Sequence, residues 1–418
     1  MGLIRGTGVR LTSHVAAGLL SLAALPLLFR HLGSADFGRY VAVLSIVGIA
    51  VLVSDVGITA IALRDSALTS GEQRRELLAG LFGARVAISI VGAVVAIVFA
   101  VLADYGSAAI AGTVLACCGL LPQIYMDMVV ATLVVEKRFG AAGSIEFARS
   151  AAGTGLVLVL VLAGAGLTWF LAAWAVAALA GAISARAAAR EAVALRPRFP
   201  RGDARALLIE SLGYSVGAAI HVVYFRAVML VVSLRAPLVQ AGWYGAAFRL
   251  TEFLGAAAGL SAGNATPTLA RASADPVEFR RSALRVLGGS ALLGLAIGGA
   301  LAVAAPLVVR IIGGDELRPA AGVVRIQAIA VGLMFVAFAA GATLFTLRRH
   351  RAIALVNAVG LCVVVAAALA LVPEHGAKGA ALASSIGEAT LLASELGVLA
   401  FVLRQPAQLS GRRSQPTN

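Results

Sequence analysis

The sequence predicts an all-α polytopic membrane protein with about twelve transmembrane helices in two six-helix lobes around a central cavity. Hydrophobic residues make up 60% of the 418 residues and charged residues only 13%, and the mean hydropathy is +0.96. A soluble domain needs more polar surface than this to cover its core. The charges lie in short clusters between apolar stretches, and each stretch reaches the length of about 20 residues that a helix needs to cross a bilayer.

Twelve such stretches follow one another along the chain, and each is bounded by charged or turn-forming residues. The chain contains 46 glycines, and small residues let membrane helices pack closely. Only the connections near 64–81, 187–211 and 264–285 reach about twenty residues, and all three are basic. The predicted helices cover residues 9–29, 40–62, 82–102, 109–134, 145–166, 168–186, 212–234, 241–263, 286–312, 321–346, 352–372 and 378–403.

Basic residues alternate between the two sides of this predicted topology. The N-terminus, the even-numbered connections and the C-terminal tail carry 25 Lys and Arg residues, whereas the odd-numbered connections carry six. Cytoplasmic loops hold the excess of Lys and Arg in membrane proteins, so both termini are predicted to be cytoplasmic. This distribution argues against a nucleic-acid-binding face despite the net charge of +14, and it suits contact with anionic phospholipids.

The two halves of the chain share a sequence feature. Residues 29–40 and 234–244 each contain an Arg, a short polar link and a Gly-x-Tyr that opens the next helix. Six helices per half makes the halves parallel repeats, and such repeats usually place a substrate path between them. We therefore predict an N-terminal six-helix lobe at 1–190, a cytoplasmic basic linker at 191–211, a C-terminal six-helix lobe at 212–403 and a cytoplasmic tail at 404–418.

Charged residues inside the predicted helices indicate a candidate site, because a charge at the bilayer centre costs about 2.5–3.5 kcal/mol on insertion scales. Arg226 and Arg249 lie near the middle of two consecutive antiparallel helices, so both reach a similar depth. Two guanidinium groups there suit a pyrophosphate, because guanidinium stays ionised and binds phosphate oxygens in bidentate fashion. The alternative is internal pairing, of Arg249 with Glu252 at i+3 and of Arg226 with Asp127 or Asp55.

Other polar residues within the predicted spans have weaker assignments. Asp55 and Asp127 are candidates for proton or cation coupling, but their position near the cytoplasmic ends of their helices favours a structural pairing with an Arg. His221 lies about one turn before Arg226 and is a candidate cavity residue, with a hydrogen-bonded packing role as the alternative. Arg325 lies near the outer end of its predicted helix, and Glu388 and Glu395 lie in the last predicted helix.

Signatures of catalysis and of bound cofactors are missing from the sequence. No Gly-rich phosphate loop is followed by Lys-Ser/Thr, and no His/Asp/Glu cluster has metal-ligand spacing. Cys117, Cys118 and Cys362 lie inside apolar stretches, which argues against a disulfide framework and against a zinc site. We therefore expect a protein without enzymatic activity, cofactor or metal.

The block LPLLFRHLGSADFGRYVAVLSIVGIAVLVSDVGITAIALRD at residues 25–65 resembles the start of the polysaccharide-biosynthesis flippases. In that family, helix 1 ends before a Leu-Gly-x-x-x-[Phe/Tyr]-Gly-x-Tyr turn, and helix 2 carries Asp-x-Gly near its inner end. Residues 136–176 and 267–285 also resemble the family. The motif residues here are Leu32, Gly33, Phe37, Gly38, Tyr40, Asp55 and Gly57.

The resemblance implies a member of the multidrug/oligosaccharidyl-lipid/polysaccharide exporter superfamily, with two six-helix lobes around a cavity that opens to one side at a time. It further implies that the chain moves an undecaprenyl-pyrophosphate-linked oligosaccharide from the inner to the outer leaflet of a bacterial plasma membrane, for O-antigen, capsule or exopolysaccharide synthesis. The expected partners are this lipid-linked oligosaccharide, a polysaccharide polymerase and other assembly proteins.

We expect basic residues to receive the headgroup of that lipid in two steps. Arg10 and Arg64 attract it on the cytoplasmic side, and Arg226 and Arg249 hold it midway. Glu252 and His221 are expected to line the same cavity, and these assignments follow from charge and depth rather than from a family motif.

Two alternatives stay open. A cation-coupled multidrug antiporter of the same superfamily favours an acidic, aromatic cavity; Asp55, Asp127 and Glu252 support it, whereas Arg226 and Arg249 argue against it. A membrane ligase or polymerase of polysaccharide assembly belongs to a different class. It needs a long non-cytoplasmic loop to hold donor and acceptor, and the predicted topology has none.

Overall fold

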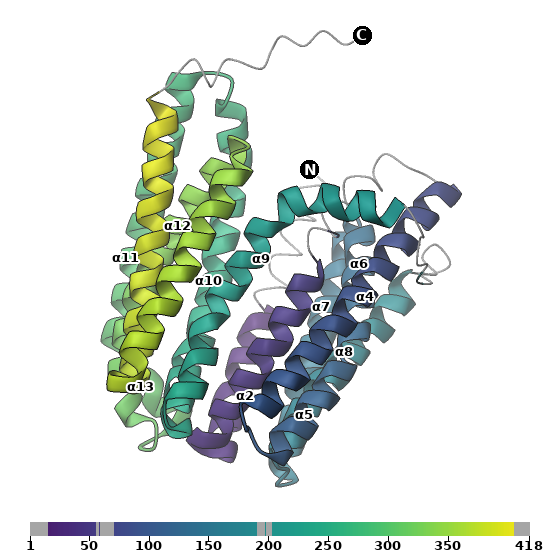
Figure 1. Cartoon of the computed structure of the whole chain (residues 1–418), viewed down its shortest axis with the longest axis vertical. Coiled ribbons are helices and arrows are strands. Elements are labelled where there is room, and N and C mark those ends of the chain that lie inside the picture. The colour runs from purple at the N-terminus through teal and green to yellow at the C-terminus, as the bar shows by residue number, and fades with distance from the viewer. Residues whose placement is uncertain (1–15, 56–57, 59–70, 190–196, 198–202, 405–418) are drawn as a thin grey trace. The chain divides into compact units, whose positions relative to one another are not determined.

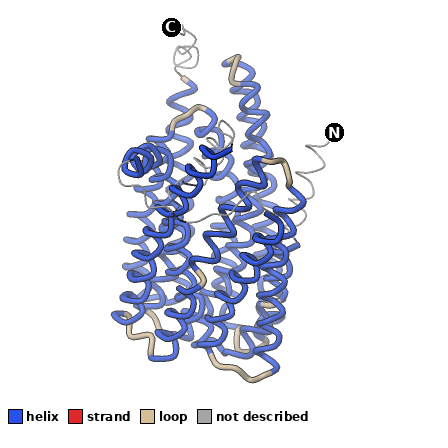
Figure 2. Tube along the Cα trace, turned by 90° about the vertical axis from the view of Figure 1, so that its right-hand side faces the viewer, coloured by secondary structure: helices blue, strands red, loops and turns tan. Residues whose placement is uncertain are grey.

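The computed structural model describes residues 16–55, 58, 71–189, 197 and 203–404. These residues are almost entirely helical, and no strand occurs among them (Figure 2). Nine of the helices they form are long and apolar enough to cross a membrane. The predicted all-α membrane class is therefore confirmed. Helices are the expected outcome, because in hydrocarbon every backbone N–H and C=O must find its partner within the protein.

The chain divides into two compact units, Met1–Val222 and Val223–Asn418. The boundary falls inside α9 (Asp203–Arg235), and the lobe boundaries predicted from the sequence stay a prediction. The first unit also contains α2 (Leu25–Asp55), α4 (Gly71–Leu102), α5 (Ser107–Cys118), α6 (Leu120–Val135), α7 (Phe139–Leu162) and α8 (Leu167–Ala189) (Figure 1). The second also contains α10 (Leu238–Ala272), α11 (Pro276–Gly313), η2 (Arg318–Ala320), α12 (Ala321–Thr346) and α13 (His350–Leu403).

Two of these helices each hold parts of two predicted spans. α13 has 54 residues, and at a rise of about 1.5 Å per residue it is more than twice as long as the hydrocarbon layer is thick. Gly376 has a φ of 55° and divides it between the predicted spans 352–372 and 378–403. Gly33 has a φ of 70° and divides α2 in the same way. The predicted span 9–29 lies outside the described residues up to residue 15.

Two segments predicted as long loops are largely helical, so this part of the prediction was wrong. α4 begins at Gly71, inside the predicted connection 64–81. Only three residues separate α10 from α11, within the predicted connection 264–285. Asp275 ends this short turn and caps α11 by accepting a hydrogen bond from the backbone N of Val277 at 2.8 Å. Hydropathy detects the apolar part of a helix, whereas the helix continues through charged residues that are good helix formers.

α11 and α12 approach each other closely through glycines (Figure 1). A Cβ atom added to Gly298 would lie 2.7 Å from the carbonyl oxygen of Ala328, and one added to Gly294 would contact the carbonyl oxygen of Gly332. Gly294 and Gly298 form a Gly-x-x-x-Gly pattern, which brings helix backbones together in lipid, where no hydrophobic effect drives association. Backbone contact at these glycines therefore fixes the distance between α11 and α12.

A side chain of α10 forms a hydrogen bond with the backbone at the break in α13. Gln240 Oε1 accepts a hydrogen bond from the backbone N of Ala377 at 3.0 Å, so the amide that follows the break has a partner. An added Cβ atom at Gly376 would overlap the same oxygen of Gln240. Both the left-handed backbone and the missing side chain therefore require glycine at this position.

We predict that Gly298→Ala destabilises the second unit, because its Cβ atom meets the backbone of α12. Overpacking of this kind lowers the free energy of unfolding by about 1–3 kcal/mol. The matched control is Gly299→Ala, because an added Cβ atom there has no neighbour within 4 Å. Reversible unfolding in mixed micelles measures both variants, and equal stability of the two would contradict the packing argument.

Candidate functional site

In the second unit, aromatic packing brings the two predicted arginines together. α9 and α10 are joined by a two-residue turn, and Phe225 packs against Phe248 with ring centroids 5.2 Å apart. Arg226 and Arg249 directly follow these rings in the sequence. At about 1.5 Å per residue, the two arginines lie about 14 Å and about 17 Å along their helices from the shared turn. Both therefore lie well inside their helices, at similar depths.

One carboxylate binds both arginines. Arg226 Nη2 lies 2.9 Å from Glu252 Oε1, and Arg249 Nη1 lies 2.8 Å from Glu252 Oε2. Each carboxylate oxygen therefore has its own guanidinium partner, at the short distance typical of charge-assisted hydrogen bonds. We call Arg226, Arg249 and Glu252 the Glu252 cluster.

The Glu252 cluster is neither electrically balanced nor fully enclosed. Two guanidinium groups face one carboxylate, so the three groups together carry one positive charge. The side chains of Arg226, Glu252 and Arg249 are 17%, 18% and 26% exposed. Part of each of these side chains is therefore not covered by the described residues.

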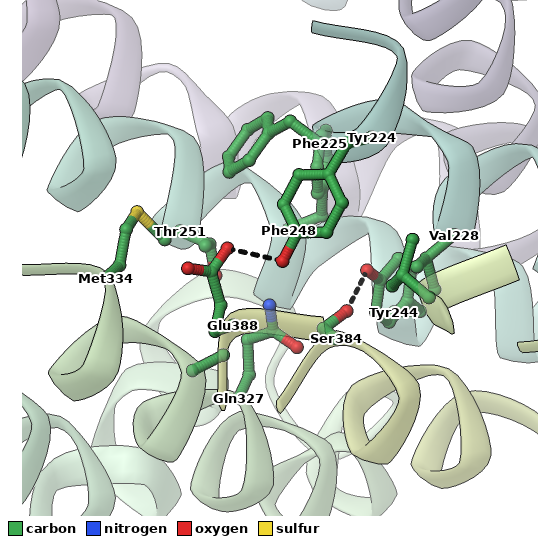
Figure 3. A pocket seen from close by; sticks show the side chains of 12 residues that line it. Tyr224, Phe225, Val228, Tyr244, Phe248, Thr251, Gln327, Met334, Ser384 and Glu388 are labelled. Carbon is green, nitrogen blue, oxygen red and sulfur yellow. Dashed lines mark hydrogen bonds between the residues drawn. The ribbon is translucent and has the colours of Figure 1, made fainter. Parts of the chain in front are cut away.

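A small cavity lined by aromatic, apolar and polar side chains lies within the second unit (Figure 3). The hydroxyl group of Tyr224 donates a hydrogen bond to Glu388 Oε1 at 2.9 Å, and the hydroxyl groups of Tyr244 and Ser384 are 2.9 Å apart. Gln327 Oε1 is buried in the lining without a hydrogen-bond partner. The cavity volume is about 20 Å³, which is room for about one water molecule.

The cavity and the Glu252 cluster occupy neighbouring faces of the same two helices. Phe225 and Thr251 line the cavity, and each directly precedes a member of the cluster in the sequence. Successive residues of an α-helix point about 100° apart. The second unit thus presents a cationic face and an acidic, aromatic face next to each other.

The first unit contains a second buried ion cluster, built around Arg85. Arg85 Nη2 donates to Asp127 Oδ2 at 2.9 Å, and Arg85 Nη1 lies 3.4 Å from Asp55 Oδ1. Gln123 Nε2 donates to the other oxygen of Asp127 at 2.8 Å. The side chain of Arg85 is only 3% exposed, so this is a charge enclosed by the protein. We call Arg85, Asp55 and Asp127 the Arg85 cluster.

Apolar packing between α4 and α6 positions the Arg85 cluster. Leu81 and Phe82 belong to one buried group with Ile124 and Met128. Arg85 follows Leu81 and Phe82 by four and three residues, so it lies on the same face of α4. Asp127 lies between Ile124 and Met128 on the partner helix. The ion pair therefore continues a contact that apolar side chains already define.

The structure brings together three of the predicted cavity residues, Arg226, Arg249 and Glu252. Both predicted acids, Asp55 and Asp127, bind Arg85, which the sequence interpretation had not considered as their partner. The remaining predicted residues are not part of either cluster. His221 lies on α9 in the first unit and is partly exposed, and Arg10 and Arg64 lie outside the described residues.

Several polar residues of these sites were missed from the sequence. Arg85 was counted with the cytoplasmic basic residues although it lies inside the predicted span 82–102, because it is close to the start of that span. The structure begins this helix at Gly71, which places Arg85 well inside it rather than at its cytoplasmic end. Tyr224 and Gln327 had no signal beyond being polar groups in apolar helices. Within the described residues, no group of three or more His, Cys, Asp and Glu side chains could hold a metal ion.

Comparison with known proteins gives both a family and a fold. Residues 3–273 match the family model described as "polysaccharide biosynthesis protein". No curated protein sequence matches the chain. Among solved structures, the chain is similar to the lipid II flippase MurJ in an inward closed conformation, with 11% identity and a TM-score of 0.75 over 95% of this chain and 87% of that chain.

Two multidrug transporters are similar over nearly their whole length. An inward-facing multidrug resistance MATE family transporter of the MOP superfamily has 13% identity and a TM-score of 0.74 over 97% of this chain and 99% of that chain. A eukaryotic MATE transporter has 13% identity and a TM-score of 0.69 over 98% of both chains. The fold is therefore that of MOP-superfamily transporters.

We predict that Arg85→Ala destabilises the first unit, because it leaves two carboxylates facing each other without their shared cation. Removing one partner of a buried ion pair lowers the free energy of unfolding by about 3 kcal/mol. The matched control on α4 is Arg75→Ala, whose side chain is 66% exposed and whose loss changes stability by less than about 0.5 kcal/mol. Thermal unfolding of the purified variants measures the difference. An Arg85→Ala variant as stable as the control would show that this cluster contributes little to stability.

Proposed function

Because the chain belongs to the polysaccharide biosynthesis protein family, we propose that it is a flippase for an undecaprenyl-pyrophosphate-linked oligosaccharide. It carries this lipid from the inner to the outer leaflet of the bacterial plasma membrane, where the oligosaccharide enters O-antigen, capsule or exopolysaccharide synthesis. The process is alternating access of two lobes, without covalent chemistry. The fold supports this proposal, because the chain has the architecture of transporters of the MOP superfamily.

The positive charge of the Glu252 cluster is the observation that carries the proposal. Two guanidinium groups well inside membrane helices share one carboxylate, and a charge there is retained only at an energetic cost. A pyrophosphate offers several charged oxygens in the geometry that a guanidinium fork binds best. An anionic cargo therefore accounts for the surplus cation, which a purely structural ion pair does not need.

In this proposal, the headgroup crosses the membrane through the protein while the lipid tail stays in the bilayer. Arg10, Arg64 and the anionic phospholipids of the inner leaflet concentrate and orient the headgroup. Arg226 and Arg249 then bind the pyrophosphate, and His221 lines the same path. The cargo shifts the equilibrium between inward-open and outward-open states only because it binds the two states differently. A polysaccharide polymerase and other assembly proteins receive the lipid on the outer side.

A cation-coupled multidrug antiporter is the second candidate, and the acidic, aromatic cavity of the second unit favours it. Tyr224, Tyr244 and Glu388 line that cavity, and aromatic rings with a carboxylate suit an organic cation. The size of the cavity argues against this candidate. Its volume is about 20 Å³, whereas a usual ligand pocket holds about 300–1,000 Å³. Uptake of an organic cation into proteoliposomes, driven by an ion gradient, separates this candidate from the flippase.

We predict that Arg226→Ala/Arg249→Ala abolishes lipid flipping while the protein level in the membrane stays unchanged. Loss of two charge-assisted interactions with the pyrophosphate lowers the flipping rate on the order of 100-fold or more. Flipping is measured in proteoliposomes as the fraction of lipid-linked oligosaccharide that an added glycosidase reaches from outside. The length of the sugar chains is read in the same samples, because a flippase leaves it unchanged and a polymerase or ligase alters it.

The control for this experiment removes the same number of cations from the same two helices. Arg235 and Arg271 are both exposed near the ends of α9 and α10. We expect Arg235→Ala/Arg271→Ala to flip at nearly the wild-type rate. Normal flipping by Arg226→Ala/Arg249→Ala would exclude this site.

We also propose that both chain termini face the cytoplasm, as the asymmetry of basic residues predicts. A green fluorescent protein fused after the C-terminal tail folds only in the cytoplasm, so this fusion is expected to fluoresce. Alkaline phosphatase fused at the same position is expected to be inactive. The opposite pair of results would reverse the orientation, and with it the direction of transport proposed for the lipid.

A further inference from the structure

The two ion pairs of the Glu252 cluster differ in how the fold sets them. Arg249 and Glu252 are three residues apart on α10, so one helix fixes their contact. Arg226 lies on α9, so its contact with Glu252 depends on how α9 packs against α10. The Arg226 contact is therefore the one that a competing anion, or a small movement of α9, separates first.

Glu252 offers the arginines the same chemistry that a phosphate offers. Its two oxygens bind one guanidinium each, at 2.9 Å and 2.8 Å, as two oxygens of a phosphate group do. A carboxylate carries one charge, whereas a diphosphate carries more charge and more acceptor oxygens. Glu252 therefore occupies the arginines in the empty protein and yields them to a stronger anion.

We propose that Glu252 is a built-in competitor that sets the affinity of the arginine site for a prenyl diphosphate. This inference rests on the proposed function of the same site. Two arginines without a counter-ion hold a diphosphate so strongly that its release limits transport, because tighter binding appears mainly as slower dissociation. Glu252 neutralises one arginine and rebinds both when the diphosphate leaves. Glu252 thus sets the affinity of the site through the two arginines and is not itself a ligand of the lipid.

The first test compares binding of geranyl diphosphate, a short soluble prenyl diphosphate, to purified full-length variants in neutral detergent. Glu252→Gln keeps the size of the side chain and removes its charge. We expect it to bind geranyl diphosphate about tenfold more tightly than the wild type, the effect of one charge-assisted interaction. We expect its flipping rate at saturating lipid to fall by about tenfold for the same reason. Glu278→Gln, which removes an exposed carboxylate from α11, is expected to change neither quantity.

A double-mutant cycle separates this role from a structural one. Arg226→Gln leaves Arg249 and Glu252 in balance, so binding is expected to fall by about tenfold or more. Arg226→Gln/Glu252→Gln restores a net positive charge at Arg249, so binding is expected to return close to the wild-type value. Partners of an ion pair couple in stability as well, so a purely structural role restores thermal stability in the double variant, whereas the competitor role restores binding between variants of equal stability. If Glu252→Gln alone folds poorly, the comparison of Arg226→Gln with Arg226→Gln/Glu252→Gln still tests the competitor role, and thermal unfolding of each variant precedes its binding measurement.

The outcomes distinguish the inference from the function on which it rests. If Arg226→Gln weakens binding but neither Glu252→Gln nor the double variant strengthens it, the competitor role is wrong and the diphosphate site stands. If Arg226→Gln and Arg226→Ala/Arg249→Ala bind geranyl diphosphate like the wild type, the diphosphate site itself is wrong, and the competitor role is wrong with it. Tighter binding by Glu252→Gln together with rescue in the double variant supports both.

Discussion

The cost of placing an ionised group among membrane helices governs the polar architecture of both units. In both clusters a central charged group lies between two groups of opposite charge, and the sign of the central charge differs between the two. One guanidinium lies between two carboxylates in the Arg85 cluster, and one carboxylate lies between two guanidinium groups in the Glu252 cluster. In each cluster the groups of opposite charge lie within 3.4 Å of one another, which offsets part of the desolvation cost.

The second unit contains one helix contact made by backbone atoms and another made by charged side chains. Backbone contact at Gly294 and Gly298 fixes α11 against α12, while the Arg226 contact joins α9 to α10 through side chains that can exchange partners. The cavity at Glu388 lies on the neighbouring face of α9 and α10. A transporter needs this combination, since a site must keep its shape while one set of its contacts changes between states.

Local patterns were predictable from the sequence, and contacts between distant segments were not. The apolar spans and the i+3 pairing of Arg249 with Glu252 follow from residues that are neighbours along one helix. The contact between Arg226 and Glu252 joins residues 26 positions apart, so it depends on the register of α9 against α10, which hydropathy does not encode. Arg85 was counted with the cytoplasmic basic residues for a related reason, because it lies only three residues into the predicted span 82–102. Hydropathy records where a helix is apolar, not where it begins.

The break in α13 has a consequence for how this protein changes over evolutionary time. The side-chain amide of Gln240 lies where a Cβ atom of residue 376 would be, and its oxygen accepts a hydrogen bond from the backbone N of Ala377. Any single replacement at position 376 collides with Gln240, while a replacement at 240 that removes the oxygen leaves the Ala377 amide without its acceptor. Neither position is free to drift alone. Homologues that retain this interrupted helix are therefore expected to keep both residues or to change both together. Paired changes at positions 240 and 376 would show that the interruption itself is maintained by selection.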